Sequence, residues 1–289
     1  MKLPDCRVPA LLLLPLVLSA CGGGGSASDG EQPLANVLAC SLRNCTESTT
    51  LNTDEISMRF TAAQKTGENT LTVSGFVSKS ANQFTTVLLQ PNEKLSATVD
   101  GGPETPLRNV DGQRLDYEVT LPATSAMPVV QLIFTRDGVQ HISSVAMPMA
   151  FRVIEPVGTP LLARSAGSLN VQLSPMTTSP SLTNSTMQGR CTRKDGSGFD
   201  VKPGTPFTTQ AGSTSGFFRI DTVPFDKTLN DLGLAVNNNA VGTSLVSRCD
   251  LTLTWSAAAF GTSPSTLSKY SSFTASRQTS NAIVYDSWL

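Results

Sequence analysis

The chain has 289 residues, a formal net charge of −1 and only 15% charged residues, with no run of like charges. This balance disfavours nucleic-acid binding, which needs an excess of Lys and Arg to replace the counterions of the phosphates. Ser, Thr, Gly and Pro are abundant. Such a composition is typical of β-rich proteins that work outside the cytoplasm.

The first residues read as a targeting segment. Lys2 and Arg7 supply positive charge, and an apolar run follows from Val8 to Leu18, interrupted by Pro9 and Pro15. The run is about half the ~20 residues that a membrane-spanning helix needs. It therefore predicts a secretory signal peptide.

The apolar run ends in Leu18-Ser19-Ala20-Cys21, which resembles the lipobox of bacterial lipoproteins. The resemblance implies that residues 1–20 are removed, that Cys21 is acylated, and that the protein is anchored to a membrane by lipid. In that family an aspartate after the cysteine favours the inner membrane, so Gly22 implies the outer membrane, on either its periplasmic or its surface face. The alternative is an ordinary secretory signal, cut near Ala20, with Cys21 unmodified.

Residues 21–52 are predicted to be a lipidated tether with a short disulfide-stapled segment. The tract Gly22–Gly25 and the following Ser26–Gly30 bury no apolar surface and keep the chain flexible. Without residues 1–20 the formal net charge becomes −2, because Lys2, Arg7 and Asp5 are lost.

Four of the six cysteines lie beyond the lipobox: Cys40, Cys45, Cys191 and Cys249. Four cysteines allow three pairings, and proximity favours Cys40–Cys45 and Cys191–Cys249. The alternative is a redox or metal site. However, Cys40 and Cys45 lack the two-residue spacing of thioredoxin-like motifs, and no nearby histidine completes a zinc set. The pattern therefore favours two structural disulfides and no metal.

Residues 53–157 carry strand signals that predict a β-sandwich. Period-two alternation of apolar and polar residues indicates strands with one buried face. Asp111-Gly112 and Asp137-Gly138 lie between such runs and favour tight hairpin turns. The alternating or apolar runs are Ile56–Phe60, Leu71–Val73, Leu95–Val99, Leu115–Leu121 and Val129–Phe134. This region resembles bacterial immunoglobulin-like domains in architecture, without a Cys–Trp–Cys signature.

Residues 158–289 predict a second, looser sandwich. Cys249, Leu251, Leu253 and Trp255 fall on one face of a single run. The separation of Cys191 from Cys249 is similar to that of the bridged strands of immunoglobulin domains, which implies an inter-sheet disulfide. Trp255 departs from that pattern because it follows the second cysteine. We expect no amphipathic helix of ten or more residues, and the best short candidate is Asp226–Leu234.

The sequence offers little catalytic chemistry. The single histidine, His141, is interpreted as a strand residue at the sheet surface, because a triad or a catalytic zinc site would need more partners. Asp116 and Glu118 share the solvent face of one strand, where nothing raises a pKa for acid catalysis. No Gly-x-Ser-x-Gly elbow or Ser-x-x-Lys motif is present. Exposed aromatic side chains could instead mark a ligand face, with candidates at Phe217, Phe218, Tyr270, Phe273, Tyr285 and Trp288.

The sequence therefore predicts an all-β protein with two immunoglobulin-like β-sandwich domains behind a signal peptide and a flexible tether. We expect a non-enzymatic binding, adhesion or assembly module of the cell envelope that needs no cofactor. Its expected partners are a membrane, through the lipid, and an envelope protein or glycan. Two alternatives remain open, namely a secreted-type carbohydrate-active or serine hydrolase with a site assembled from distant residues, and a structural spacer.

Overall fold

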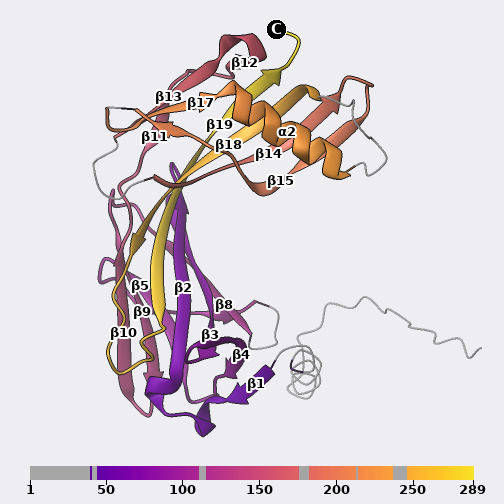
Figure 1. Ribbon diagram of the computed structural model, residues 1–289. Coiled ribbons are helices and arrows are strands. Elements are labelled where there is room, and N and C mark those ends of the chain that lie inside the picture. The colour runs from indigo at the N-terminus through magenta and orange to yellow at the C-terminus, as the bar shows by residue number, and fades with distance from the viewer. Residues whose placement is uncertain (1–39, 41–43, 111–114, 176–181, 213, 237–245) are drawn as a thin grey trace, which may run out of the picture.

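The computed structural model describes Cys40 and residues 44–110, 115–175, 182–212, 214–236 and 246–289. These residues form mainly β-strands, together with the helix α2 (Thr222–Val236) (Figure 1). They are arranged as two lobes that give the molecule the outline of a C. The all-β class and the sandwich packing expected from the sequence are confirmed. The proposed lipidation site, Cys21, lies outside the described residues.

One mixed sheet of eleven strands, here called the long sheet, runs through both lobes. Its main order is β1-β4-β3-β2-β19-β18-β14-β15, and β8, β7 and β12 pair at its sides. Its strands are β1 (Asn44–Glu47), β2 (Ile56–Lys65), β3 (Thr70–Lys79), β4 (Asn82–Leu88), β7 (Arg108–Asn109), β8 (Asp116–Pro122), β12 (Leu161–Ala163), β14 (Leu182–Arg193), β15 (Gly198–Pro206), β18 (Val246–Phe260) and β19 (Ser272–Asp286).

Two four-stranded sheets cover one face of the long sheet, one in each lobe. The first-lobe sheet contains β5 (Lys94–Val99), β6 (Thr105–Pro106), β9 (Val129–Arg136) and β10 (Val139–Ala146). The second-lobe sheet contains β11 (Arg152–Glu155), β13 (Ser168–Ser174), β16 (Gln210–Ala211) and β17 (Phe217–Asp221). The short 3₁₀ turns are η1 (Ser48–Thr50), η2 (Thr53–Glu55) and η3 (Arg164–Ala166).

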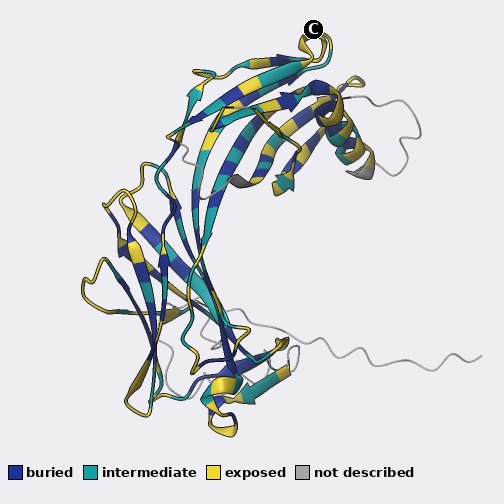
Figure 2. Cartoon of the chain, turned by 60° about the vertical axis from the view of Figure 1, so that its left-hand side comes forward, coloured by how far each residue is buried: buried dark blue, intermediate teal, exposed yellow. Residues whose placement is uncertain are grey.

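The core of the first lobe is formed by the residues that the apolar–polar alternation predicted to face inward. Met58, Phe60 and Ala62 of β2 are buried, and so are Leu71 and Val73 of β3. Figure 2 shows this alternation of buried and less buried residues along the strands. β9 and β10 form the hairpin expected at Asp137-Gly138, where both residues have positive φ (50° and 78°) as such a turn requires. The Asp111-Gly112 turn lies outside the described residues.

The second lobe contains a helix that is longer than the short candidate Asp226–Leu234, although no helix of ten or more residues was expected. α2 spans 15 residues and packs over the long sheet with Phe225 and Leu229 buried and Leu232 half-buried. These positions follow an i, i+4, i+7 spacing, which is helical. The prediction was wrong because the candidate segment began at Asp226 and so left Phe225 out of the pattern.

The two cores do not divide at residue 157. β18 and β19 have 15 residues each and run from one lobe into the other. Phe273 and Ala275 of β19 lie in the first core, whereas Ile283 and Tyr285 lie in the second. The expected boundary between 53–157 and 158–289 therefore does not separate the two lobes, because residues 272–278 pair in parallel with β2 of the first lobe.

Both disulfides favoured by proximity are present, Cys40–Cys45 and Cys191–Cys249. Cys191 and Cys249 face each other directly on the neighbouring strands β14 and β18 of the long sheet. The inter-sheet bridge implied by the immunoglobulin resemblance is therefore wrong. The bridge links two strands of one sheet, and its sulfur atoms point into the second core.

Candidate binding surface

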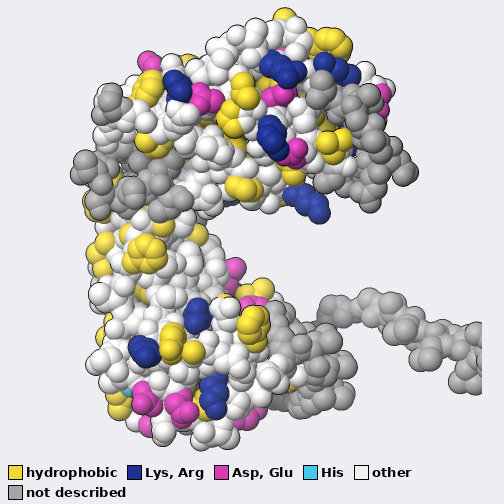
Figure 3. Space-filling model, in the orientation of Figure 1, with side chains coloured by type: hydrophobic (Ala, Val, Ile, Leu, Met, Phe, Trp, Pro, Cys, Tyr) yellow, Lys and Arg dark blue, Asp and Glu magenta, His cyan; other side chains and the backbone are white. Residues whose placement is uncertain are grey.

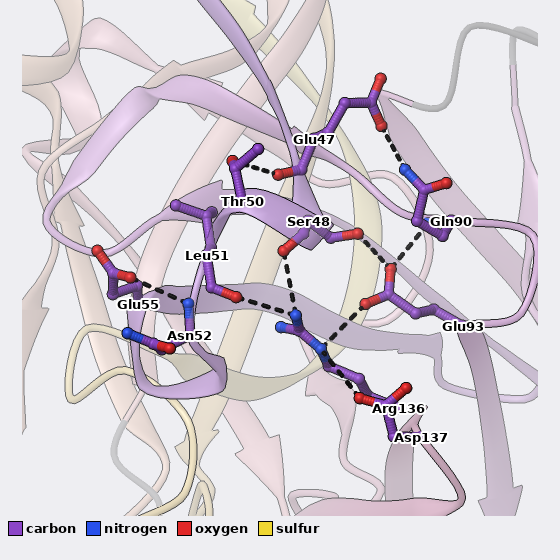
Figure 4. Close-up of polar contacts among 10 residues, drawn as sticks. All are labelled: Glu47, Ser48, Thr50, Leu51, Asn52, Glu55, Gln90, Glu93, Arg136 and Asp137. Carbon is purple, nitrogen blue, oxygen red and sulfur yellow. Dashed lines mark hydrogen bonds and ion pairs between the residues drawn. The ribbon is translucent and has the colours of Figure 1, made fainter.

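The chain enters the fold at the far end of the first lobe, where a buried ion pair holds it (Figure 4). Arg136 lies 3.4 Å from Glu93, and the two side chains are 15% and 3% exposed. Arg136 also donates to the backbone carbonyl oxygens of Ser48 (3.2 Å) and Leu51 (2.9 Å). A charge pair with this many hydrogen-bond partners fixes residues 48–51, which belong to the fold although the sequence placed them within the predicted tether segment 21–52.

The structure does not bring the titratable candidates together. His141 is only 7% exposed, and its Nδ1 lies 2.8 Å from the hydroxyl of Thr266. The expected position at the sheet surface is wrong, because His141 follows the inward alternation of Ser143 and Val145 on β10. Asp116 and Glu118 lie on the outer face of β8, half-buried and exposed respectively, as expected.

The aromatic candidates divide between core and surface. Phe273 and Tyr285 are buried, whereas Tyr270 and Trp288 are 41% and 68% exposed. Lys194 lies over the Trp288 ring, 4.4 Å from its centroid.

The hollow side of the C is formed by the uncovered face of the long sheet. The first-lobe sheet, the second-lobe sheet and α2 all pack on the opposite face, because the inward residues of β19 are buried in both cores. Figure 1 shows the first-lobe sheet on the outer side of the C. Strands of both lobes therefore present their outward side chains to the same hollow. In Figure 3 much of the surface bordering the hollow is white, the colour of the backbone and of uncharged polar side chains, with some charged and hydrophobic side chains along its rims.

We call this surface the concave face and define it by the outward side chains of five neighbouring strands. Strand registers place these side chains in rows across the sheet. The rows are Ser74-Thr61-Thr274-Phe260, Thr72-Ala63-Ser276-Ala258, Lys65-Gln278-Ser256-Asn184, Ser280-Thr254-Thr186 and Ala282-Thr252-Gln188.

Hydroxyl groups on the concave face are paired across strands. The hydroxyls of Thr61 and Thr274 lie 2.9 Å apart, and those of Thr254 and Ser280 lie 3.1 Å apart. Such cross-strand pairs limit the rotation of the side chains before any ligand arrives. The face is thus a preorganised grid of hydroxyl, amide and methyl groups.

Charges lie at the two ends of the concave face. Arg59, Asp116 and Glu118 border its first-lobe end, and Arg190 with Asp250 borders its second-lobe end. Within the rows, all of whose residues are described, the single formal charge is Lys65, 3.9 Å from Glu68. The centre of the face is therefore electrically neutral.

The opposite face of the long sheet carries a polar layer at the waist between the cores. Arg277 and Gln64 are 3% and 5% exposed, and Arg277 donates to the Gln64 side chain at 2.6 Å. Gln64 in turn donates to the carbonyl oxygens of Glu68 and Ala123, and burial lowers the pKa of Arg277. Trp255 donates to Asn281 at 2.8 Å. These bonds connect β19 with β2 and with β18 on the covered side of the sheet that carries the concave face.

Two pockets on the described surface lack the groups that hydrolysis needs. One, of about 370 Å³, is lined by uncharged residues that include Asn184, Phe207 and Phe218. The other, of about 480 Å³, has Lys79 as the ionisable member of its lining. Across the residues that the structure describes, no cluster of three or more metal-ligating side chains occurs, and no helix could cross a membrane.

The chain has weak structural likenesses and no match among families. No family model matches it, and no curated protein sequence matches it. Solved structures similar to it include a chimeric titin Z1Z2 that carries a decorin peptide (11% identity, 82% of this chain and 99% of that one, TM-score 0.23). Others are the tandem Ig repeats of Dlar (8%, 80% and 97%, 0.23) and the Yersinia pseudotuberculosis adhesin InvE (12%, 81% and 60%, 0.22). At these TM-scores the fold rests on the strand arrangement of the chain itself.

Proposed function

We propose that this protein is a lipid-anchored, non-catalytic binding module of the bacterial cell envelope, and that its partner occupies the concave face. One observation carries the proposal: a continuous, neutral and preorganised surface extends over both lobes. A structural spacer would have no need of such a surface. A hydrolase would need converging ionisable groups, and neither of the two pockets described above supplies them.

The lipid anchor rests on the lipobox Leu18-Ser19-Ala20-Cys21. Acylation with more than one chain would give stable attachment. The ion pair between Arg136 and Glu93 holds residues 48–51 at the far end of the first lobe, and the proposed anchor at Cys21 precedes these residues in the chain. The second lobe and the hollow would then stand away from the membrane, accessible to a partner.

The anchor is tested by fractionation of cells that express the Cys21→Ser variant. We expect the wild-type protein in the outer-membrane fraction and the variant in the soluble fraction. A variant that stays with the membranes would contradict acylation at Cys21.

The binding surface is tested by site-specific photo-crosslinking in intact cells. A photo-reactive amino acid replaces Ser276 at the centre of the concave face, or Gln140 on the outer side of the first-lobe sheet as the matched control. We expect adducts from position 276 and none from position 140. Adducts from position 140 alone would place the partner on the wrong side of the molecule and refute the proposed surface.

A further inference from the structure

We infer that the partner held by the concave face is a neutral polysaccharide chain, with Phe260 as the ring on which a sugar stacks. The inference rests on the proposed function, because it names the class of ligand for the same surface.

Phe260 offers an exposed aromatic ring beside the hydroxyl groups of the concave face. Its side chain is 85% exposed at the end of β18, although a large apolar residue on a sheet face normally packs against a neighbour. The register places it beside Thr274, which pairs with Thr61. An exposed ring beside fixed hydroxyls offers a sugar an apolar surface for its C–H groups and hydrogen-bond partners for its edge.

The position of Phe260 is fixed by the backbone that follows it. A Cβ on Gly261 would lie 2.3 Å from the carbonyl oxygen of Ser144 and 2.8 Å from that of Phe273. Only glycine allows this approach, and Thr262 then pairs with Ser144 through two backbone hydrogen bonds of 2.8 and 2.9 Å. The chain is thereby held immediately after Phe260, which places its ring at the edge of the concave face.

The hydroxyl groups of the concave face also suit a sugar polymer. Each Ser or Thr hydroxyl both donates and accepts, which suits a ligand whose own hydroxyls do the same. The Thr61–Thr274 and Thr254–Ser280 pairs lie three rows apart along β19. From Thr274 to Ala282 the strand extends about 27 Å at ~3.4 Å per residue. The grid therefore suits an extended chain of several sugars better than a single small molecule.

The charge of the concave face favours a neutral ligand. An anionic polymer would meet no compensating cations within the rows except Lys65, which already lies beside Glu68. A typical protein interface has a core enriched in aromatic residues, Met and Arg, whereas Thr, Ser and Ala predominate here. A neutral, hydroxyl-rich polymer matches both the near absence of charge in the rows, where Lys65 lies beside Glu68, and the scarcity of large apolar groups.

The test is affinity electrophoresis of the full chain, purified in detergent, in native gels that contain a neutral polysaccharide (dextran, amylose, galactomannan or a soluble β-glucan). Gels with alginate serve as the anionic comparison. We expect at least one neutral polymer to retard the protein, with little effect of added salt, and alginate to have no effect.

Two variants locate the binding. Phe260→Ala is expected to weaken retardation at least tenfold, whereas Phe84→Ala, which truncates a phenylalanine 77% exposed on β4, leaves it unchanged. The double variant Thr61→Val, Thr274→Val keeps the side-chain shape, removes two hydroxyls, and is expected to weaken binding severalfold. Circular dichroism and thermal unfolding confirm that each variant is folded.

The outcomes separate this inference from the proposed function. Retardation that is equal in the wild type and in Phe260→Ala and the double variant overturns the inference. So does an absence of retardation by every neutral polymer. If crosslinks from position 276 then capture a protein, the ligand is a protein and the proposed function stands. If position 276 gives no adduct at all, both fail.

Discussion

The contact between Tyr285 and Asp226 ties α2 to the long sheet, and we expect Tyr285→Phe to destabilise the second lobe by about 2 kcal/mol. Tyr285 is fully buried, and its hydroxyl donates to a carboxylate oxygen of Asp226, which is 6% exposed. The other carboxylate oxygen lies 3.2 Å from Arg164, whose side chain is 46% exposed. Phenylalanine keeps the packing of the ring but leaves one oxygen of a buried charge without its donor. Hydrogen bonds to charged groups are worth about 1.5–3 kcal/mol.

The assay is equilibrium unfolding in urea followed by tryptophan fluorescence. Trp255 is fully buried in the same core, so its emission reports the loss of this packing. With a slope of about 3 kcal/mol per M, a loss of 2 kcal/mol lowers the midpoint by about 0.7 M. Tyr270→Phe, at a tyrosine that is 41% exposed, is the control and should leave the midpoint unchanged. A Tyr285→Phe midpoint equal to the wild type would refute the reasoning.

The same contact predicts alkaline instability. Burial, with the hydrogen bond to Asp226, raises the pKa of Tyr285 above its usual value near 10. A raised pKa in the folded state means that this contribution to stability is complete below pH 10 and is lost as the pH rises further. We expect the stability of the wild type to fall above pH 10 and that of Tyr285→Phe to fall less steeply. Parallel pH profiles would contradict this origin.

Further predictions concern the disulfide, a close backbone contact and the histidine. Replacing both Cys191 and Cys249 by serine removes a bridge that spans 58 residues of sequence. The free energy of unfolding should fall by up to about 4 kcal/mol, because the unfolded chain gains entropy without the bridge. The urea midpoint is compared with that of the wild type with and without reductant, and an unchanged midpoint would refute the structural role. Gly75→Ala should lower the free energy of unfolding by about 3 kcal/mol, because a Cβ there would lie 2.1 Å from the carbonyl oxygen of Arg59. Gly67→Ala is the control. Its Cβ would meet no atom, and the positive φ alone should lower the free energy of unfolding by about 1 kcal/mol. Burial, reinforced by the charge of Arg136, lowers the pKa of His141 below 6.5. Stability should therefore decline from pH 7 to pH 5 and decline less in His141→Gln, and identical declines would exclude His141 as the cause.

Local patterns predicted most of the strands of the first lobe. Leu115, Tyr117, Val119 and Leu121 alternate with polar residues, and all four are buried in the structure. An alternation of apolar and polar residues with a period of two is enough to identify a strand with one covered face, because neighbouring side chains point to opposite sides. The Asp137-Gly138 turn was predictable for a similarly local reason, its tolerance of positive φ.

The concave face could not be predicted from the sequence, although all of its residues fall in strands or strand-like runs that the sequence contains. Thr61, Thr274 and Phe260 are far apart in the sequence and meet only because β19 pairs with both β2 and β18. Alternation shows that such residues face outward. It does not show that the outward faces of two lobes line one hollow. The alternation that buries Trp255 also places Phe260 on the outward face, but it does not show whether another segment covers its ring.

The sequence by itself determined the strand-forming runs, the pairing of cysteines by proximity, and an N-terminal segment that resembles a lipoprotein signal. These are properties of short segments, and short-range sterics and hydrophobic alternation are sufficient to set them. Tertiary structure alone decided that β18 and β19 join both lobes in one sheet and that Cys191 bridges neighbouring strands rather than two sheets. It also decided which outward side chains share the concave face. Strand pairing decides such features, because contacts between residues distant in sequence depend on the whole arrangement of strands and not on any one of them.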